Sequence, residues 1–409
     1  MSLAAGFGRL RAALFVLVCA LLLGGCARPQ IFHQESYVFG TRVDVAVYGE
    51  DKAQADAASA LVLREFYRLH RAYHAWEPSE LTALNEAIAR GESLEVSEEL
   101  ATMLRDAQRM AAAGDELFDP ALGSLIALWG FHTDTFVPVR PDPEKLAALV
   151  AARPRMSDLD IDGRRVSSRN PAVQLDLGGY AKGYALDRAA TLLREQGITN
   201  ALINIGGNVM ALGKKGDQPW RIGIQHPRAP APLATMPLYD GEAVGTSGDY
   251  QRYFELDGER YAHLLDPRTG QPAHGTQSLT VLITPREAAG TLSDAASKPA
   301  YLANEGWREQ TRHFGIDHAL RVDAAGKVEV TRALRARLQF PAPVDAVVVD
   351  YARLESALLA RTLSAPCVLR LHVRSSATPR PVILRLAAGR LRAALRLFAA
   401  RLAAALVRG

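Results

Sequence analysis

The residues with the clearest chemical potential surround a pair of glycines. Asp176 precedes Gly178-Gly179, and Lys182 follows the pair by three residues. If a helix begins here, its free N–H groups, its positive dipole end and the lysine ammonium would together suit a phosphate group. The alternative is a tight strand-to-helix turn with solvated charges, which is the better interpretation of a glycine pair without other support. Neither common nucleotide-binding glycine pattern occurs in this stretch.

The surrounding pattern predicts the elements that would position these groups. Alternating Val173, Leu175 and Leu177 predict a strand before the glycines. A helix should follow and end at Gly197, and a second strand should span Ala201–Ile205. The apolar residues that recur at helical spacing are Ala185, Leu186, Ala189, Leu192 and Leu193. The glycine pair would therefore lie between a strand and the N-terminus of a helix.

A histidine with a defined neighbourhood occurs further along. Asp257-Gly258, between YFEL and ERYAHLL, predicts a hairpin with a type I′ turn. That turn would pair Phe254 with Tyr261 and place His263 opposite Arg252 at the far end of the strand. The imidazole would then lie beside the turn that starts at Asp266. A solitary histidine is more often structural than catalytic, so the pattern alone does not assign it a role.

Three further segments have predicted structures that affect these groups. We expect a helix over Ala288–Glu305, with Asp294 and Lys298 on one face. Pro299 disfavours regular helix at Lys298. Leu122–Phe131 should be a mostly apolar helix, and Pro227–Pro237 a proline-rich loop.

Six sequence blocks resemble the FAD:protein FMN transferase family, ApbE. They occur in the family's order, and the resemblance covers roughly Phe32 to Phe340. The blocks are FGT from Phe39, WEPSELTALN from Trp76, FDPALGSLIALWGF from Phe118, DLGGYAKGYALD from Asp176, GTSGDYQRYF from Gly245 and HLLDPRTGQP from His263. The resemblance implies an α+β fold related to T-folds, with mixed or antiparallel sheets and a cofactor cleft between two lobes.

The activity implied by the resemblance is a phosphoryl transfer. FMN would pass from FAD to a threonine or serine hydroxyl of a target protein through a phosphoester bond, with Mg²⁺ as cofactor. Such a reaction depends on positioning and charge neutralisation more than on a protein nucleophile. One alternative is a periplasmic FAD-binding protein, or an FAD pyrophosphatase without transfer to protein. A second is a structural outer-membrane lipoprotein that has no affinity for FAD.

The resemblance also implies a role for individual residues. His263 would be the general base and would also contact the cofactor, with an ordinary pKa of about 6.5. Gly179 would offer its carbonyl, and Asp294 its carboxylate, to the magnesium ion. Lys298 occupies the usual threonine ligand position, where an ammonium would repel the cation, so Ser297 is the substitute ligand. The remaining cofactor-binding residues are Phe39, Gly40, Trp76, Leu117, Phe118, Asp119, Asp176 and Lys182.

The N-terminal residues predict export and lipidation. Arg9 and Arg11 precede an apolar run that closes on Leu-Gly-Gly before Cys26. This resembles a bacterial lipobox, so residues 1–25 would be a signal peptide, Cys26 the lipidated residue and residues 26–31 a tether. The alternative is an ordinary signal peptide with an incidental cysteine. We therefore expect a periplasmic protein that is lipid-anchored to the outer membrane. The family resemblance implies that its acceptor is a periplasm-facing subunit of a flavin-dependent electron-transfer complex.

The domain at residues 32–340 is followed by an extension of different composition at residues 341–409. After Glu355 there are ten arginines, no lysine and no acidic residue. Without these arginines the net charge falls from +4 to −6, so the body shows no nucleic-acid-binding character. Pro381–Gly409 should form an arginine-faced helix suited to an anionic membrane. An unordered extension and an unselected extension from a shifted reading frame are the alternatives.

Overall fold

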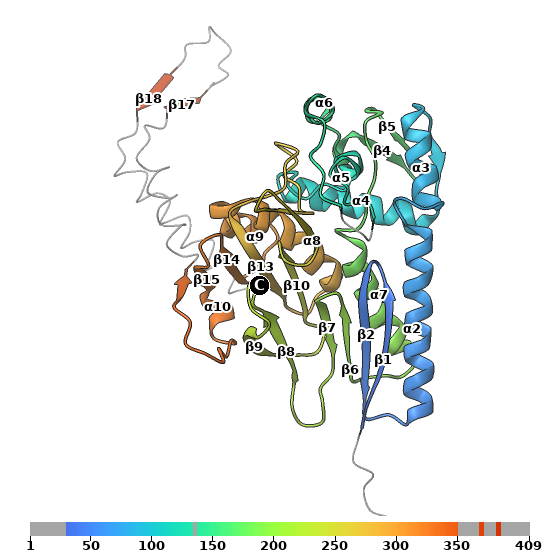
Figure 1. Cartoon of the computed structure of the whole chain (residues 1–409), viewed down its shortest axis with the longest axis vertical. Coiled ribbons are helices and arrows are strands. Elements are labelled where there is room, and N and C mark those ends of the chain that lie inside the picture. The colour runs from blue at the N-terminus through green and yellow to red at the C-terminus, as the bar shows by residue number, and fades with distance from the viewer. Residues whose placement is uncertain (1–29, 134–136, 351–367, 372–381, 386–409) are drawn as a thin grey trace, which may run out of the picture. The chain divides into compact units, whose positions relative to one another are not determined.

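The computed structural model describes residues 30–133, 137–350, 368–371 and 382–385. Residues up to Val348 belong to one compact unit, and residues from Val349 belong to a second unit. The first unit is built on a nine-stranded sheet with the order β1-β2-β6-β7-β10-β13-β14-β15-β16 (Figure 1). Its strands are β1 (Ile31–Val38), β2 (Thr41–Tyr48), β6 (Ala201–Ile205), β7 (Asn208–Leu212), β10 (Ala243–Gly248), β13 (Thr276–Ile283), β14 (His318–Asp323), β15 (Val328–Thr331) and β16 (Ala346–Val349).

Each pairing from β1 to β15 is antiparallel, so the family-based expectation of antiparallel sheets is confirmed. Long helices cover one face of this sheet and a second layer covers the other. The helices are α2 (Lys52–Ala72), α7 (Ala181–Glu195) and α8 (Ala289–Leu302), with α9 (Trp307–His313) packed on α8. In β10, Ser247 meets α8, whereas Val244 packs into the apolar cluster on the opposite face.

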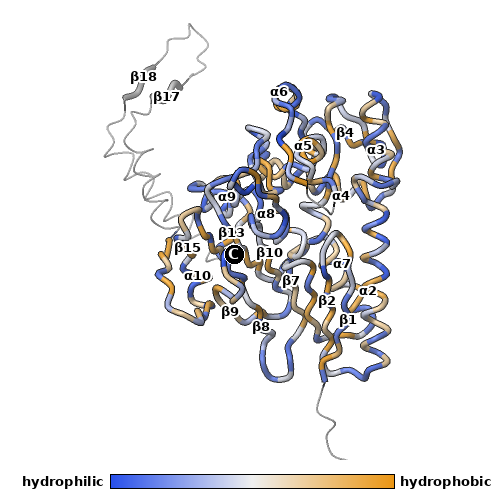
Figure 2. The backbone as a smooth tube through the Cα atoms, viewed as in Figure 1, coloured by the Kyte–Doolittle hydropathy of each residue, from blue (hydrophilic) through white to orange (hydrophobic). Residues whose placement is uncertain are grey.

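That opposite cluster contains the hairpin of β8 (Trp220–Gln225) and β9 (Pro232–Leu238), together with α10 (Arg332–Arg335). Figure 2 shows the hydrophobic residues following the strands of the sheet. β13, in the middle of the order, is buried along its whole length. The sheet is therefore a rigid base between two apolar layers, and the ends of its strands can hold side chains in fixed positions.

A smaller group of elements lies beyond one end of the sheet (Figure 1). It comprises α3 (Glu80–Ala89), β3 (Leu94–Glu95), α4 (Glu98–Ala113), α5 (Gly123–Leu128), α6 (Pro143–Ala152), the short helix η1 (Met156–Asp158), β4 (Leu159–Asp162) and β5 (Arg165–Ser168). The hairpin of β11 (Tyr253–Leu256) and β12 (Glu259–Ala262) packs against α5 through a cluster that contains Trp129, Phe131 and Tyr261. A short helix η2 (Asn304–Gly306) follows α8. The α+β class is confirmed, and the division into two lobes stays a prediction.

Several elements have the predicted bounds and register. Strand β6 spans the expected residues. Phe254 pairs with Tyr261 as expected. Asp257 and Gly258 have φ angles of 54° and 78°, and positive φ at both central residues is the mark of a type I′ turn. These successes share one property: the determining residues lie within a few positions of one another.

Four predictions about local structure in the first unit are wrong. The predicted strand at 173–177 is an extended segment with a single parallel bridge, from Gln174 to Leu122. On its other edge the Asn85 side chain accepts from Leu175 N and donates to Leu175 O, in place of a neighbouring strand. α5 ends at Leu128, because Gly130 turns the chain with a φ of 74°. The predicted proline-rich loop contains β9, in which Pro232 is the first residue.

The fourth wrong prediction concerns α8, which continues through Pro299. A proline inside a helix removes one backbone hydrogen bond and costs about 3 kcal/mol. Here the helix is buried along nearly all of its length, and Gly114 leaves room for the proline ring. Tertiary packing therefore offsets the local preference. As a result, Asp294 and Lys298 lie one turn apart on a regular helix.

The second unit contains one described hairpin, of β17 (Val368–Leu371) and β18 (Val382–Arg385), which pair antiparallel. The helix predicted from Pro381 is therefore wrong at Val382–Arg385. The rest of that segment, the signal peptide, Cys26 and Cys367 lie outside the described residues. β16 lies beyond Phe340, where the predicted domain ends. In the described ranges, no helix combines the length and apolar character needed to cross a membrane.

Candidate active site

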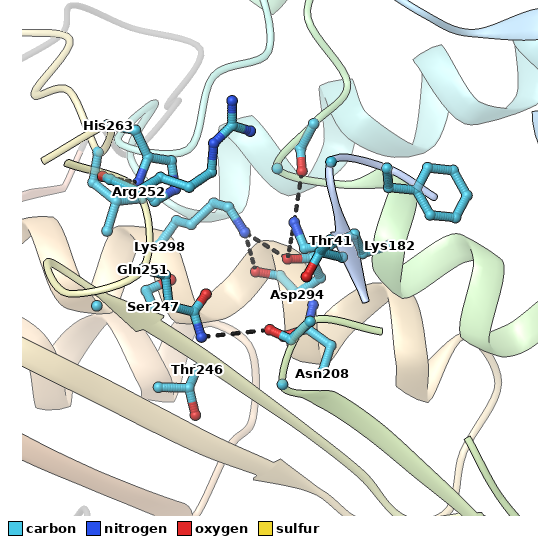
Figure 3. A pocket seen from close by; sticks show the side chains of 18 of the residues that line it. Thr41, Lys182, Asn208, Thr246, Ser247, Gln251, Arg252, His263, Asp294 and Lys298 are labelled. Atoms are coloured by element: carbon cyan, nitrogen blue, oxygen red, sulfur yellow. Dashed lines mark hydrogen bonds and ion pairs between the residues drawn. The ribbon is translucent and has the colours of Figure 1, made fainter. Parts of the chain in front are cut away.

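The groups singled out in the sequence meet at a cavity in the first unit. Its volume is about 770 Å³, within the range of roughly 300–1,000 Å³ that is typical of small-molecule and cofactor sites. The walls come from the β1–β2 turn, the segment around Phe118, the N-terminus of α7, the ends of β7 and β10, and α8. Figure 3 shows Asp294 and Lys298 at its centre and His263 with Arg252 to one side.

The position of Asp294 results from a close crossing of α7 and α8. A Cβ added to Gly183 would lie 2.4 Å from the carbonyl oxygen of Gly290, so only glycine permits this approach. The crossing lets the backbone N–H of Gly183 donate to Asp294 Oδ2 at 3.0 Å. Gly183 is in the first turn of α7, where backbone N–H groups lack partners within the helix. The helix N-terminus predicted to hold a phosphate therefore holds the Asp294 carboxylate at this N–H group.

Two lysines complete the charged centre. Lys298 Nζ donates to Asp294 Oδ1 at 2.7 Å and to the Asp294 backbone oxygen at 2.8 Å. Lys182 Nζ lies 3.8 Å from the same carboxylate oxygen and donates to Gly178 O at 2.9 Å. With Asp294 ionised and both lysines protonated, the centre carries a net charge of +1. The cavity therefore has a cationic floor that suits a phosphate or pyrophosphate group.

The pKa values of the centre follow from burial and from this pairing. Burial disfavours the charged form of Asp294, but Lys182, Lys298 and the Gly183 N–H outweigh it and hold the pKa of the carboxyl below its usual range. Burial lowers the pKa of Lys298, and the charge of Asp294 opposes that shift. The carboxyl group is therefore ionised at neutral pH and acts as the counter-ion of the two ammonium groups.

Most of the residues predicted to bind the cofactor line this cavity. Phe39 and Gly40 form the β1–β2 turn with φ angles of 57° and 66°, and the Phe39 ring packs against Phe66 and His70. The lining residues from the predicted set are Phe39, Gly40, Leu117, Phe118, Asp119, Asp176, Gly179, Lys182, His263 and Asp294. The structure thus brings together residues that are up to 255 positions apart in the chain (Phe39 to Asp294).

Asp119 has an unusual environment within this set. Its Oδ1 accepts hydrogen bonds from the backbone N–H groups of Ala121 and Met156, at 2.9 and 3.1 Å. Burial raises the pKa of Asp119 to about 7, and the two backbone N–H groups oppose that rise. The carboxyl group fixes the turn that presents Leu117 and Phe118 to the cavity. At neutral pH it titrates, which an exposed aspartate would not do.

His263 is held at the end of β12 as the hairpin pattern predicted. Its backbone N–H donates to Arg252 O at 3.1 Å, and its Nδ1 lies 3.0 Å from the same oxygen. Burial, together with the charge of Arg252, lowers the pKa of His263 to about 3. The expected pKa near neutrality is therefore wrong for the free protein. The imidazole is neutral there, which is the form that a general base requires.

Two predicted site residues lie outside the cavity lining. Trp76 is half-buried, and its ring packs against His132 with centroids 5.5 Å apart. Ser297 is buried: its hydroxyl donates to Asp294 O at 2.9 Å and lies 2.8 Å from Ser247 Oγ. Ser297 faces β10 because α8 packs that side on the sheet. Its hydroxyl is thus engaged by Ser247 and by the Asp294 backbone, Ser297 itself is not a lining residue, and its role as a metal ligand stays a prediction.

The structure also places residues in the wall that the sequence did not single out. Asn208, at the start of β7, is buried, and its Nδ2 has no hydrogen-bond partner in the described part of the chain. A buried donor without a partner at a cavity is a position for a ligand acceptor. Thr246 and Arg252 also line the wall. Their blocks were recognised, but nothing in the sequence shows that Asn208 follows a glycine turn into the same cavity.

The family resemblance implies a magnesium ion held by oxygen atoms of Asp294 and Gly179. Both carboxylate oxygens of Asp294 already accept a hydrogen bond, Oδ1 from an ammonium group and Oδ2 from a backbone N–H. A Cβ on Gly179 would lie 2.7 Å from Lys298 Cε, so the lysine side chain fills the space beside that residue. Among the described residues, no group of three or more His, Cys, Asp or Glu could hold a metal ion. Because both oxygens of Asp294 are engaged and the Lys298 ammonium lies beside them, the residues present do not fit a divalent cation.

Comparisons with known proteins agree with the sequence blocks. The model of the ApbE family matches residues 39–316. An FAD:protein FMN transferase of Rhodobacter capsulatus is 43% identical over 343 residues, which cover 81% of this chain and 65% of that protein. The chain thus spans slightly less than two thirds of the length of this relative. An FAD:protein FMN transferase of Vibrio cholerae is 33% identical over 278 residues, covering 66% of this chain and 82% of that protein.

Solved structures show the same architecture. An ApbE protein from Thermotoga maritima superposes with a TM-score of 0.69 at 32% identity, covering 75% of this chain and 99% of that one. The apo form of a flavinyl transferase ApbE from Pseudomonas stutzeri gives a TM-score of 0.66 at 28% identity, with 78% and 100% covered. The similarity covers nearly the whole of each solved chain.

Proposed function

Because this chain belongs to the ApbE family, we propose that it is an FAD:protein FMN transferase, with FAD as donor and a threonine or serine hydroxyl of another protein as acceptor. The observation that carries the proposal is the cationic floor of the cavity, where Lys182 and Lys298 flank Asp294. FAD has an anionic pyrophosphate between two aromatic ends. A cavity with a cationic centre and apolar walls such as Phe118 and Phe131 suits that combination.

The transfer is a single displacement at phosphorus. The acceptor hydroxyl oxygen forms a bond to the FMN phosphorus, and the bond from that phosphorus to the bridging oxygen breaks, which releases AMP. The hydroxyl proton passes to Nε2 of neutral His263, whose Nδ1 is held at Arg252 O. Lys182 neutralises charge on the phosphoryl oxygens. The products are AMP and a protein carrying FMN through a phosphoester bond.

No step of the proposed reaction uses a magnesium ion. The family resemblance implies a Mg²⁺-dependent reaction, but the donor set around Asp294 does not fit the ion. The charge that a cation would supply has another source in this chain, the ammonium of Lys298, which lines the cavity. The proposed reaction therefore uses only groups that the chain itself provides.

The cellular setting is part of the same proposal. Cys26 is the lipid attachment site, residues 1–25 are removed, and the enzyme acts in the bacterial periplasm at the outer membrane. Its acceptor is a periplasm-facing subunit of a flavin-dependent electron-transfer complex. The sequence features that support this setting are the basic n-region, the short apolar run and Leu-Gly-Gly before the cysteine.

The test is direct. The purified protein is mixed with FAD and a protein that carries a solvent-exposed threonine, and covalent flavin is detected by in-gel fluorescence while AMP is measured by chromatography. Transfer predicts equal amounts of AMP and covalent FMN. AMP with free FMN and no flavin band would identify a pyrophosphatase instead. FAD binding without AMP would leave only a flavin-binding protein, and no FAD binding would contradict any flavin-related function.

A further inference from the structure

Lys298 occupies the position in which a bound cation would be expected. Its Nζ is 2.7 Å from Asp294 Oδ1 and 2.8 Å from the backbone oxygen of the same residue. The side chain is 15% exposed and lines the cavity, and its methylene groups lie against Gly179. The ammonium thus bonds to the two oxygens of Asp294 that face it and reaches the space beside the glycine pair. The Lys298 side chain thus fills the space between Asp294 and the glycine pair.

We propose that the Lys298 ammonium replaces the divalent cation, so that this protein binds FAD and transfers FMN without a metal ion. The inference rests on the proposed function and specifies how the pyrophosphate is neutralised. Lys298 remains protonated throughout. It donates hydrogen bonds to phosphate oxygens, while the bonds formed and broken at phosphorus, and the proton passed to His263, are those of the transfer itself.

The net charge of the centre indicates that Lys298 takes the place of a divalent cation and does not bind beside one. Asp294 together with Lys182 and Lys298 already sums to +1 when all three are ionised. A divalent ion placed beside them would raise the sum to +3 at separations of a few ångströms, where like charges repel strongly. An ammonium also needs no set of oxygen ligands around it. Its three N–H groups can be shared between Asp294 and a phosphate.

An ordinary structural ion pair is the competing explanation, and the chain offers a matched example of one. Lys52 and Asp56 form an i,i+4 pair on the surface of α2, remote from the cavity. Exposed pairs of this kind contribute little to stability and have no ligand beside them. If Lys298 were only structural, its removal would change folding but not the response of FAD binding to metal ions.

The experiment compares the full protein with the variants Lys298→Met, Lys298→Thr, Lys298→Arg and Lys52→Met. Each is assayed in EDTA and in excess Mg²⁺ for FAD affinity by fluorescence quenching, and for AMP release and FMN transfer. Mn²⁺ binding is followed by electron paramagnetic resonance as a readout independent of activity. Circular dichroism establishes that each variant is folded.

The wild-type protein and Lys52→Met should bind FAD and turn over equally in EDTA and in Mg²⁺. Lys298→Met loses FAD affinity by about tenfold or more, since a charge-assisted hydrogen bond is lost. Lys298→Arg retains metal-independent binding. Lys298→Thr requires Mg²⁺ for turnover and gains a Mn²⁺ site, because a hydroxyl replaces the repelling ammonium.

Distinct outcomes would overturn the inference and the proposed function. Wild-type turnover that is abolished by EDTA and restored by Mg²⁺ would overturn the inference and leave the transferase proposal intact. FAD affinity that is the same in Lys298→Met as in the wild type would also overturn it. Absence of AMP release and transfer under both conditions would contradict the proposed function, and the FAD-binding measurements would still decide the role of Lys298. If Lys298→Met fails to fold, Gly179→Ala, whose added Cβ displaces Lys298 Cε, takes its place in the binding assay.

Discussion

Replacing Asp294 by asparagine tests the charged centre through stability alone. The carboxylate accepts from Lys298 Nζ and from Gly183 N, and lies 3.8 Å from Lys182 Nζ. The Asp294 side chain is 3% exposed. Asparagine keeps the shape and one acceptor oxygen but removes the negative charge. Two partly buried ammonium groups are then left without a counter-ion.

The size of the effect follows from breaking a buried ion pair on one side. Such a change costs about 3–5 kcal/mol, because an uncompensated charge remains in the interior. Lys298 can reduce this cost by losing its proton, and its pKa is already below the usual value. In Asp294→Asn the folded-state pKa of Lys298 falls further below its unfolded value, so the folded protein binds fewer protons than the unfolded chain. Stability of the variant should therefore rise with pH from neutrality towards pH 10.

Urea unfolding at pH 7 and at pH 9, followed by circular dichroism, measures both quantities. Lys298→Met and the double variant complete a thermodynamic cycle, and Asp56→Asn on α2 is the matched surface control. We expect the double variant to be less destabilised than the sum of the single ones by about 1–3 kcal/mol. Additive effects, within about 0.5 kcal/mol, would refute the argument that the two groups form one charged unit.

The same variant also distinguishes a counter-ion from a metal ligand. As a counter-ion, Asp294 reduces the positive charge that FAD meets. At a pH at which Lys298 keeps its proton, Asp294→Asn therefore raises the net charge of the centre from +1 to +2 and should strengthen FAD binding in EDTA. As a metal ligand, its removal would weaken binding in Mg²⁺. Weaker FAD binding in EDTA would contradict the counter-ion role.

Three further predictions concern the cavity wall. Asn208→Asp should weaken FAD binding by about tenfold, since a donor without a protein partner becomes an acceptor; unchanged affinity by fluorescence quenching would place Nδ2 away from the ligand. Because the folded-state pKa of Asp119 is raised, the wild-type protein should lose a few kcal/mol of stability as the pH rises from about 4 to 7, and Asp119→Asn should not. The same dependence of unfolding free energy on pH in both proteins would contradict this. With the pKa of His263 lowered to about 3, the pH profile of kcat/KM should show no histidine ionisation near pH 6.5. His263→Ala should nevertheless reduce kcat by about 10²–10⁴-fold near that pH.

The sequence by itself determined the local elements and the identity of the site. Asp257-Gly258 specified its hairpin because both residues tolerate positive φ, and apolar residues at helical spacing specified α7, which ends just before Gly197. These are interactions among residues a few positions apart, so a pattern can express them. The glycine pair, Lys182 and His263 were identified through sequence blocks and Asp294 through the family resemblance, and the structure brings all of them to one cavity.

Only the tertiary structure decided which partner each side chain takes. Gly183 and Asp294 are 111 residues apart, and they meet because two glycines let α7 and α8 approach closely. That crossing sets Ser297 against Ser247, and it sets Lys298 on Asp294 beside Gly179. Spacing along a helix places residues on a shared face, but it does not state what lies opposite that face. A lysine one turn after an aspartate therefore looked like a flaw in a metal site, whereas packing shows its ammonium hydrogen-bonded to Asp294 in the cavity wall.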